Sequence, residues 1–293
     1  MAIRIFTDTN SDLGKDLREK YNIEYFKMCN AIEGEIVPAD LDWPRFSPKE
    51  FYDMLREGKK RVSTTQVPAE QFRKSFTECL EAGEDVIYVG CALPLSASVN
   101  AAAVVARDLL AKYPEGKIFC VDSKNCCLGE GMMAVLAAKL RDEGKSTEEI
   151  VAAIEEKRQY VNQYLTVGSL DRLKKTGRVK GSAAFFGNLL GVKPILISDA
   201  NGQNVPIMKV KGRVASMDKL VELLAESVVD PAEQTVYIGH ADCLEEAEAL
   251  KDKVMKLGFA DAYINVINPV VGACVGPGAI CLWAFGKKIE TAI

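Results

Sequence analysis

The feature that most constrains this chain is the alternation of short apolar runs with helix-like segments over its first 160 residues. Apolar runs typical of buried strands occur at residues 3–6, 85–90 and 117–121. Each is followed by a polar loop, and segments with helical periodicity follow, as at 100–112 and 129–143. This alternation predicts a parallel sheet covered by helices, because parallel strands need long crossover connections.

After residue 160 the pattern becomes less regular, which places a domain boundary there. A hairpin-like turn, Asp-Ala-Asn-Gly, lies at 199–202, and an apolar helix is expected at 183–190. The length of 293 residues suits two domains of ordinary size. We therefore predict one α/β domain over residues 1–160 and a second over residues 161–293. Strands are expected in the second at 163–167, 192–197, 205–210, 235–239, 263–267 and 280–285.

The charge pattern argues against nucleic acid and membrane as partners. The sequence has 37 Lys and Arg against 41 Asp and Glu, a net charge of −4, whereas surfaces that bind duplexes are rich in cations. Residues 262–286 carry no charge, a stretch long enough to span a bilayer. Because glycines and prolines interrupt it, we predict a strand, a Gly/Pro loop and a second strand inside a soluble protein, without membrane insertion.

The cysteines and the single histidine limit the chemistry. Nine cysteines without a CxxC pair lie mostly in apolar runs, which is typical of reduced, buried thiols in the cytoplasm. The first residues show no signal-peptide pattern, so a cytoplasmic location is expected. His240 is the only histidine, which excludes a multi-histidine metal site. Neither a metal nor a cofactor is therefore expected.

Two hydroxyl-rich loops precede expected helices. Residues 63–66 (Ser-Thr-Thr-Gln) stand before a helix at 69–82, and residues 96–98 (Ser-Ala-Ser) stand before the helix at 100–112. Hydroxyls and unpaired backbone N–H groups at a helix N-terminus bind carboxylates or phosphates. The same residues also serve as plain helix caps, so both interpretations stay open at this point.

Three further features have structural and functional interpretations. Asp8 and Asp12, four residues apart in the first polar loop, are interpreted as capping residues rather than as an acid pair. The glycine-dense stretch at 271–279 lets the backbone come close to a ligand, or it simply makes a buried turn possible. The basic segment at 169–178 ends in a glycine cap.

Short motifs, in order along nearly the whole chain, resemble those of the DegV family of bacterial fatty-acid-binding proteins. Thr-Thr-Gln at 64–66 is similar to the family's Thr-Ser-Gln-Pro loop, with Val67 in place of proline. Leu-Ser-Ala-Ser at 95–98 resembles Leu-Ser-Gly-Thr, and Leu-Lys-Lys-Thr-Gly-Arg at 173–178 resembles Leu-Lys-Lys-Gly-Gly-Arg. Further matches are Phe-Thr-Asp at 6–8, Asp-Ser at 122–123, Gly-Glu-Gly at 129–131, Lys-Pro-Ile-Leu at 193–196 and His-Ala at 240–241.

The resemblance implies a two-domain α/β protein with a parallel sheet in the first domain, a mixed sheet in the second and a ligand cleft between them. It implies one long-chain fatty acid in an apolar tunnel, with the carboxylate held by Thr64, Ser96 and the Ala97 amide. Thr65, Cys274 and Gly276 are expected beside the head group, and Cys274 stands where the family usually has histidine. The residues expected to line the tunnel, or else to pack in the core, are Phe185, Phe186, Leu189 and Leu190.

The resemblance also implies a partner protein. In some family members the carrier presents the acyl carboxylate to a separate fatty acid kinase, which makes acyl-phosphate for phospholipid metabolism, so the carrier itself is not an enzyme. Arg178, Lys211 and Arg213 are expected to contact such a partner. Lys211 stands where the family has arginine, and an ammonium group does not copy the bidentate contacts of guanidinium.

Two other functions stay open from the sequence. The first is a binding protein for another small anion, because Ala97 and Val67 replace family glycine and proline and could reshape the head-group site. The second is an acyl-transfer enzyme with Cys274 as nucleophile. The shortage of bases weighs against this enzyme, since His240 is the only histidine.

Overall fold

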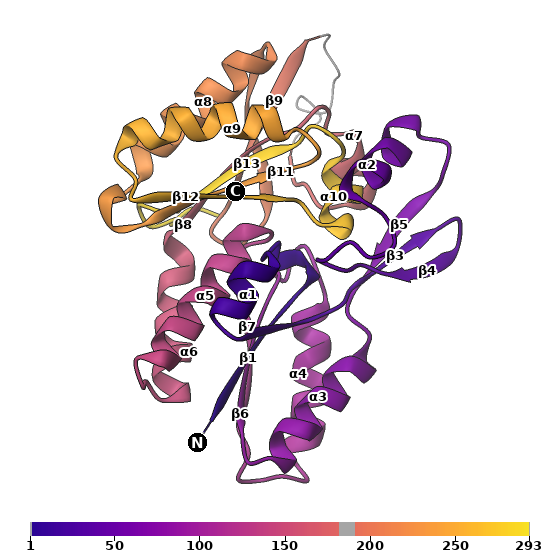
Figure 1. Cartoon of the computed structure of the whole chain (residues 1–293), viewed down its shortest axis with the longest axis vertical. Helices are drawn as coiled ribbons and strands as arrows, with labels where there is room; N and C mark the ends of the chain where they lie inside the picture. The colour runs from indigo at the N-terminus through magenta and orange to yellow at the C-terminus, as the bar shows by residue number, and fades with distance from the viewer. Residues whose placement is uncertain (1, 182–190, 293) are drawn as a thin grey trace.

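The structure is a computed structural model that describes residues 2–181 and 191–292. Within these residues the strands form three sheets, of four, three and six strands. Figure 1 shows the first half of the chain in indigo and magenta below the second half in orange and yellow. The three-stranded sheet projects to one side of the boundary between them.

The four-stranded sheet is parallel throughout, as the sequence predicts. Its strand order is β2-β1-β6-β7, and neighbouring strands pair in parallel register. The central strand β6 is buried along its whole length, which explains why its sequence is almost uniformly apolar. The strands are β1 (Ile3–Asp8), β2 (Ile23–Phe26), β6 (Asp85–Gly90) and β7 (Ile118–Asp122).

Helices cover both faces of this sheet. On one face, α3 (Ala69–Glu81) and α4 (Ser98–Leu110) pack over an aromatic cluster that includes Phe26, Phe72 and Tyr88. On the other lie α5 (Leu128–Asp142) and α6 (Thr147–Lys157), as Figure 1 shows. The short elements at its edges are η1 (Thr9–Ser11), α1 (Lys15–Lys20) and η2 (Arg158–Tyr160).

The six-stranded sheet is mixed, which also agrees with the expectation. Its order is β10-β9-β8-β13-β11-β12, and only the β11–β12 pair among these described strands is parallel. Helices α8 (Arg213–Ser227) and α9 (Leu244–Val254) cover one face, while α5 reaches the other. The strands are β8 (Val161–Thr166), β9 (Val192–Ser198), β10 (Asn204–Lys211), β11 (Thr235–His240), β12 (Asp261–Val266) and β13 (Ile280–Phe285).

The three-stranded antiparallel sheet was missed by the sequence patterns. It has the order β4-β3-β5 and carries helix α2 (Pro48–Glu57) beside it. Its strands are only four residues long and alternate weakly, which hides them from a periodicity search. One consequence is a correction: Thr64 and Thr65 lie on a strand rather than in a loop. The strands are β3 (Cys29–Ile32), β4 (Glu35–Pro38) and β5 (Val62–Thr65).

A second correction concerns the uncharged stretch near the C-terminus. The expected Gly/Pro loop contains helix α10 (Pro269–Val275), and only the turn at 276–279 remains irregular. Asn268 caps the helix by accepting from the amides of Val270 and Val271, and proline at the first helical position suits a helix start. Gly272 makes room for Tyr52, since an added Cβ would meet the Tyr52 hydroxyl at 2.5 Å.

The two large sheets share one hydrophobic core. A single cluster of buried residues includes Ile87 of β6, Leu165 of β8 and Trp283 of β13. Gly129 of α5 sits against the Trp283 ring, where an added Cβ would meet the ring at 2.5 Å. The small residue therefore allows α5 to bridge the two sheets.

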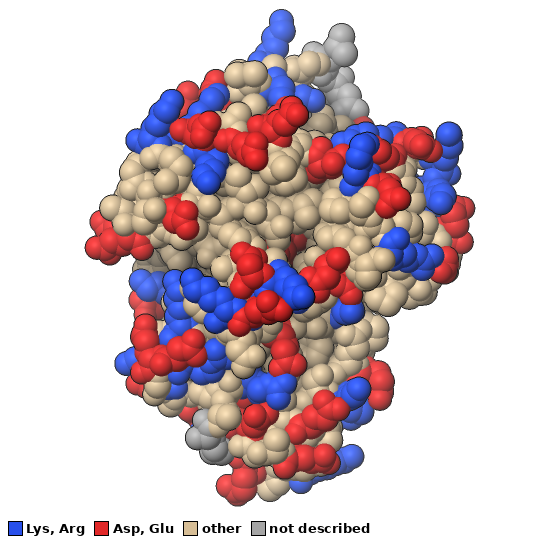
Figure 2. Space-filling view, viewed as in Figure 1, with Lys and Arg blue, Asp and Glu red and all other residues tan. Residues whose placement is uncertain are grey.

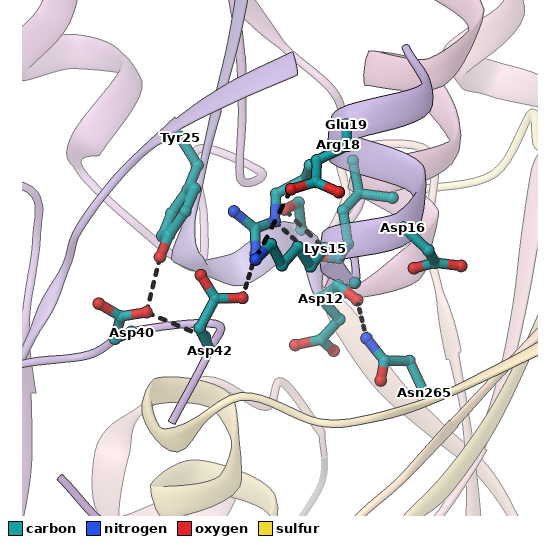
Figure 3. A network of polar contacts seen from close by, with 12 residues as sticks. Asp12, Lys15, Asp16, Arg18, Glu19, Tyr25, Asp40, Asp42 and Asn265 are labelled. Atoms are coloured by element: carbon teal, nitrogen blue, oxygen red, sulfur yellow. Dashed lines mark hydrogen bonds and ion pairs between the residues drawn. The ribbon is translucent and has the colours of Figure 1, made fainter. Parts of the chain in front are cut away.

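A network of polar side chains holds α1, the segment after β4 and strand β12 of the second half together (Figure 3). Arg18 pairs with Asp42, and Tyr25 donates to Asp40 at 2.7 Å. Asn265 of β12 donates from Nδ2 to the backbone oxygen of Asp12 at 2.7 Å. These contacts fix the three-stranded sheet and the second half against the parallel sheet.

The surface mixes charges of both signs. On the face in Figure 2, Lys and Arg lie beside Asp and Glu over both halves, with no large area of one sign. Among the helices of the described ranges, none has the length and apolar character needed to cross a bilayer.

Candidate functional site

A large cavity lies where the polar loops of the parallel sheet meet the six-stranded sheet. It encloses about 850 Å³ of space, including its open mouth, which is within the range of small-molecule sites. Its walls come from both halves of the chain and from the three-stranded sheet. The lining residues are Asn10, Met28, Thr64, Thr65, Gln66, Cys91, Leu95, Ser96, Ala97, Cys126, Cys127, Gln163, Leu165, Leu173, Arg178, Asn204, Ile267, Val270, Val271, Cys274, Val275, Cys281 and Trp283.

The structure brings both hydroxyl-rich segments to this cavity. Thr64 and Thr65 reach it from β5, which pairs with β3 in antiparallel register. Ser96 and Ala97 reach it from the loop between β6 and α4. Thr65 and Ala97 are exposed, whereas Ser96 is buried, so these residues mark the mouth of the cavity.

The Ser96 hydroxyl has a capping role and still lines the cavity. Its oxygen accepts from the Ser98 amide at 3.3 Å and lies 3.0 Å from the Ser98 hydroxyl, which accepts from the Val67 amide. These bonds tie the loop after β6 to the segment after β5. The two segments therefore form one preorganised wall rather than two separate helix caps.

A positive charge lies in the same wall. Arg178 follows the glycine cap of α7 (Asp171–Thr176), and its Nε donates to the Leu95 oxygen at 3.2 Å. A second donor of the guanidinium bonds the Thr176 oxygen. Because it lines the cavity beside the Ser96 loop, this cation is placed to attract an anion.

Cys274 completes this group from helix α10. Burial raises the pKa of its thiol, and the hydroxyls of Thr176 and Thr64 and the charge of Arg178 act in the opposite direction. A raised pKa keeps the sulfur protonated and weakly nucleophilic. His240 does not line the cavity, and its Nδ1 accepts from the Cys243 amide at 3.3 Å. The geometry therefore provides no Cys–His pair for acyl transfer.

The polar side chains of the interior bond one another. Trp283 Nε1 donates to Gln163 Oε1 at 3.2 Å, and Gln163 Nε2 donates to Asn204 Oδ1 at 2.8 Å. Asn204 Nδ2 in turn donates to the Arg178 backbone oxygen at 3.2 Å. Asn10 differs, because its buried Oδ1 has no hydrogen-bond partner among the described residues. With the other three polar side chains engaged in this chain, the interior presents mainly carbon and sulfur atoms to a ligand.

Three predicted site residues lie elsewhere. Gly276 ends α10 with a positive φ of 79° and lines a separate surface pocket with Arg172. Arg213 forms a bidentate ion pair with Glu246, with contacts of 2.6 to 3.2 Å. Lys211 lies exposed at the end of β10. The tunnel residues expected on the apolar helix, Phe185, Phe186, Leu189 and Leu190, lie outside the described residues.

Sequence reasoning missed much of the interior lining. Asn10, Gln163 and Asn204 are single polar residues with no motif around them, and Trp283 belongs to an apolar strand. The one available signal was the position of Asn10 just after the first parallel strand, where α/β proteins place ligands. Within the described residues, no cluster of three or more His, Cys, Asp or Glu side chains has a geometry that could hold a metal ion.

Among the described residues, fold and site together define an α/β protein of three sheets with a mainly apolar cavity and a polar mouth. Its family follows from a sequence model described as "Uncharacterised protein, DegV family", which matches residues 2–287. The chain belongs to the DegV family. It is 36% identical over 288 residues to a DegV domain-containing protein of Clostridium perfringens, covering 98% of each chain.

Solved structures show the same fold. A DegV family protein from Thermus thermophilus, whose structure is described with fatty acid binding, matches with a TM-score of 0.86 and 27% identity. DegV from Bacillus subtilis, described as a fatty acid binding protein, matches with a TM-score of 0.83 and 26% identity. Each comparison covers 98% of this chain and 100% of the other.

Proposed function

We propose that this protein binds one long-chain fatty acid, with its carboxylate at Thr64 and Ser96 and its acyl chain inside the cavity. The observation that carries the proposal is the placement of both hydroxyl segments at the mouth of one mainly apolar cavity. Binding of fatty acids by structural relatives in the same family supports it. We also propose that the chain divides near residue 160 into two domains that together enclose the ligand.

The apolar interior supplies most of the affinity in this proposal. Burying about 14 methylenes contributes on the order of 11 kcal/mol before the costs of ordering the chain, at about 0.8 kcal/mol each. Leu165, Val271 and Trp283 offer the apolar surface for this. Because Gln163 donates to Asn204, and Asn204 donates to the Arg178 backbone oxygen, an acyl chain would desolvate few polar groups here.

The polar groups at the mouth of the cavity orient the fatty acid in this proposal. A carboxylate loses its hydration when it binds, so several donors must replace the lost water. Thr64 and Ser96 hydroxyls and the Ala97 amide are donors at the mouth, and Arg178 adds a positive charge. Arg178 thereby takes a role at the head group instead of the partner contact that the resemblance implied.

The proposal includes presentation of the carboxylate to a fatty acid kinase. Thr65, Gln66 and Ala97 are exposed cavity residues, so a head group at this mouth is reachable from outside. Lys211, exposed at the end of β10, remains a proposed contact for such a partner. The carrier itself then needs no catalytic residue, in agreement with the protonated thiol of Cys274.

The test is the ligand content of the purified protein and its binding of palmitate. We expect extraction and mass spectrometry to yield about one long-chain acid per chain. The double variant with Thr64→Ala and Ser96→Ala should bind palmitate at least tenfold more weakly, because two hydrogen bonds to a charged group are lost. Binding of hexadecanol, which lacks the charge, should change much less.

Ser63→Ala is the matched control. Ser63 lies on the same strand β5 but is not a lining residue, so this variant should bind palmitate like the wild type. A wild-type protein that carries no acyl chain and binds no added palmitate would overturn the proposal.

A further inference from the structure

Asp12 is buried at the junction of the two halves and makes an unusual set of contacts for a loop residue. Its Oδ1 accepts from the Asn268 backbone amide at 2.8 Å and from Asn268 Nδ2 at 2.6 Å. Its backbone oxygen accepts from Asn265 Nδ2 (Figure 3). Asp12 itself has a left-handed φ of 51°, which is uncommon for residues other than glycine, although Asp and Asn adopt it more often than most.

Asn268, the residue that Asp12 binds, is the N-cap of helix α10, and this helix forms part of the cavity wall. Asn268 Oδ1 accepts from the amides of Val270 and Val271, the first turn of α10. Val270, Val271, Cys274 and Val275 of this seven-residue helix line the cavity. One carboxylate from the first half of the chain therefore anchors a wall contributed by the second half.

No cation compensates this carboxylate among the described residues. Its Oδ2 accepts no hydrogen bond from the described residues, and no Lys, Arg or His in those ranges forms an ion pair with it. The titratable groups that face it are Tyr52 of α2, Cys127 before α5 and Cys281 of β13. Each of these is neutral at physiological pH when buried.

The charge of Asp12 therefore changes near neutral pH. Burial raises its pKa to about 7, while the hydrogen bonds from Asn268 and the neighbouring Cys127 thiol act in the opposite direction. An ionised carboxylate accepts hydrogen bonds about twice as strongly as a neutral carboxyl group. The raised pKa shows, however, that burial penalises the ionised form by more than these bonds return, so ionisation above neutral pH weakens the attachment of Asp12 to the cavity wall.

We infer that Asp12 is a positioning residue for the fatty-acid site, which through Asn268 sets how firmly α10 closes the cavity and how fast the ligand leaves. The inference rests on the proposed function for its ligand. Ionisation of Asp12 favours its release into water, which loosens the capping residue and with it four lining side chains. Release of the fatty acid is accordingly faster at mildly alkaline pH.

The direct test is hydrogen–deuterium exchange of the ligand-free protein at pH 6 and pH 8, corrected for intrinsic exchange rates. We expect the amides at 268–276 to be about tenfold better protected at pH 6. Asp12→Asn keeps an acceptor for Asn268 but cannot ionise, so its protection should stay at the high value at both pH values. Asp16→Asn is the matched control, since exposed Asp16 accepts from Tyr263 at the same junction.

A second variant covers the case that Asp12→Asn does not fold. Asn268→Ser keeps a capping oxygen for α10 but removes the Nδ2 donor to Asp12. Its change in protection between pH 6 and pH 8 should be clearly smaller than that of the wild type. Equal protection of α10 at both pH values in the wild type, or an unchanged pH response in these variants, overturns the inference.

Palmitate dissociation provides the functional measurement. Stopped-flow release should be about tenfold faster at pH 8 than at pH 6 for the wild type and for Asp16→Asn, and nearly independent of pH for Asp12→Asn. If palmitate binds with pH-independent release, the role of Asp12 fails while the proposed function stands. If palmitate binds at neither pH, the proposed function fails, and the exchange measurement still decides whether Asp12 controls α10.

Discussion

The mouth and the interior of the cavity are built in different ways. At the mouth, Thr64, Ser96 and Ala97 come from two short segments that are partly exposed and rich in hydrogen-bond donors. In the interior, Leu165 and Trp283 come from neighbouring strands of the six-stranded sheet and are almost fully buried. Head-group recognition in the proposed site therefore depends on local motifs, whereas the apolar volume of the cavity depends on the packing of the whole fold.

The largest expected effect tests the interior. Trp283→Ala removes a ring that is 1% exposed, packs on Gly129 and bonds Gln163, so it should cost about 3–5 kcal/mol of unfolding free energy. Urea denaturation measures this loss. Trp43→Ala, at a half-buried ring outside the cavity, is the control and should cost less. Equal losses in the two variants would contradict a shared core at Trp283.

The next effect tests the mouth. Arg178→Gln removes the cation of the mouth and should weaken palmitate binding by about tenfold or more, because hydrogen bonds to charged groups contribute about 1.5–3 kcal/mol. Isothermal titration with palmitate and with hexadecanol separates charge from apolar contact. Lys180→Gln removes an exposed cation two residues away that does not line the cavity, and it should leave both affinities unchanged.

A pH experiment tests the contribution of a buried carboxyl group, Glu130 of α5, to the free energy of unfolding. Burial raises the pKa of Glu130 well above 4.5, and the nearby Asp8 carboxyl raises it further, while Thr7 donates to it at 2.9 Å. A carboxyl with a raised pKa in the folded state gives stability that is complete below its unfolded pKa and lost as pH rises through the folded pKa. The wild type should therefore lose more unfolding free energy than Glu130→Gln between pH 5 and pH 9.

The matched control for this experiment is Glu143→Gln. Glu143 ends the same helix α5 but is exposed, so its variant should show the pH dependence of the wild type. A Glu130→Gln protein whose stability falls with pH as steeply as that of the wild type would show that Glu130 does not titrate in this range.

The smallest effect concerns a residue outside both regions. Arg213 pairs with Glu246 on the half-exposed surface between α8 and α9. Arg213→Ala should cost about 0.2–1 kcal/mol of unfolding free energy, the range of exposed ion pairs, and leave palmitate affinity unchanged. A double-mutant cycle with Glu246→Ala measures the pair energy. A large loss of palmitate affinity in Arg213→Ala would instead show that Arg213 belongs to the head-group site.

The sequence predicted the two sheets better than the site. Strongly apolar strands such as β6 and β13 can be recognised from their sequences alone. The parallel arrangement of the first sheet follows from the helices between its strands. The four-residue strands β3 to β5 and helix α10 escaped, because short elements rich in small or polar residues have little periodicity. Thr64, Ser96 and Cys274, which the sequence placed at the head group, do line the cavity, and their contact with a ligand stays a prediction.

The sequence by itself determined the alternation of strands and helices, the polar loops after the parallel strands and the family motifs, because each depends on residues close together in the chain. Only the tertiary structure decided that Arg178 belongs to the mouth, that Gln163 and Asn204 satisfy each other, and that Asp12 anchors Asn268 more than 250 residues away. The physical reason is that burial, charge compensation and hydrogen-bond partners are properties of the assembled fold.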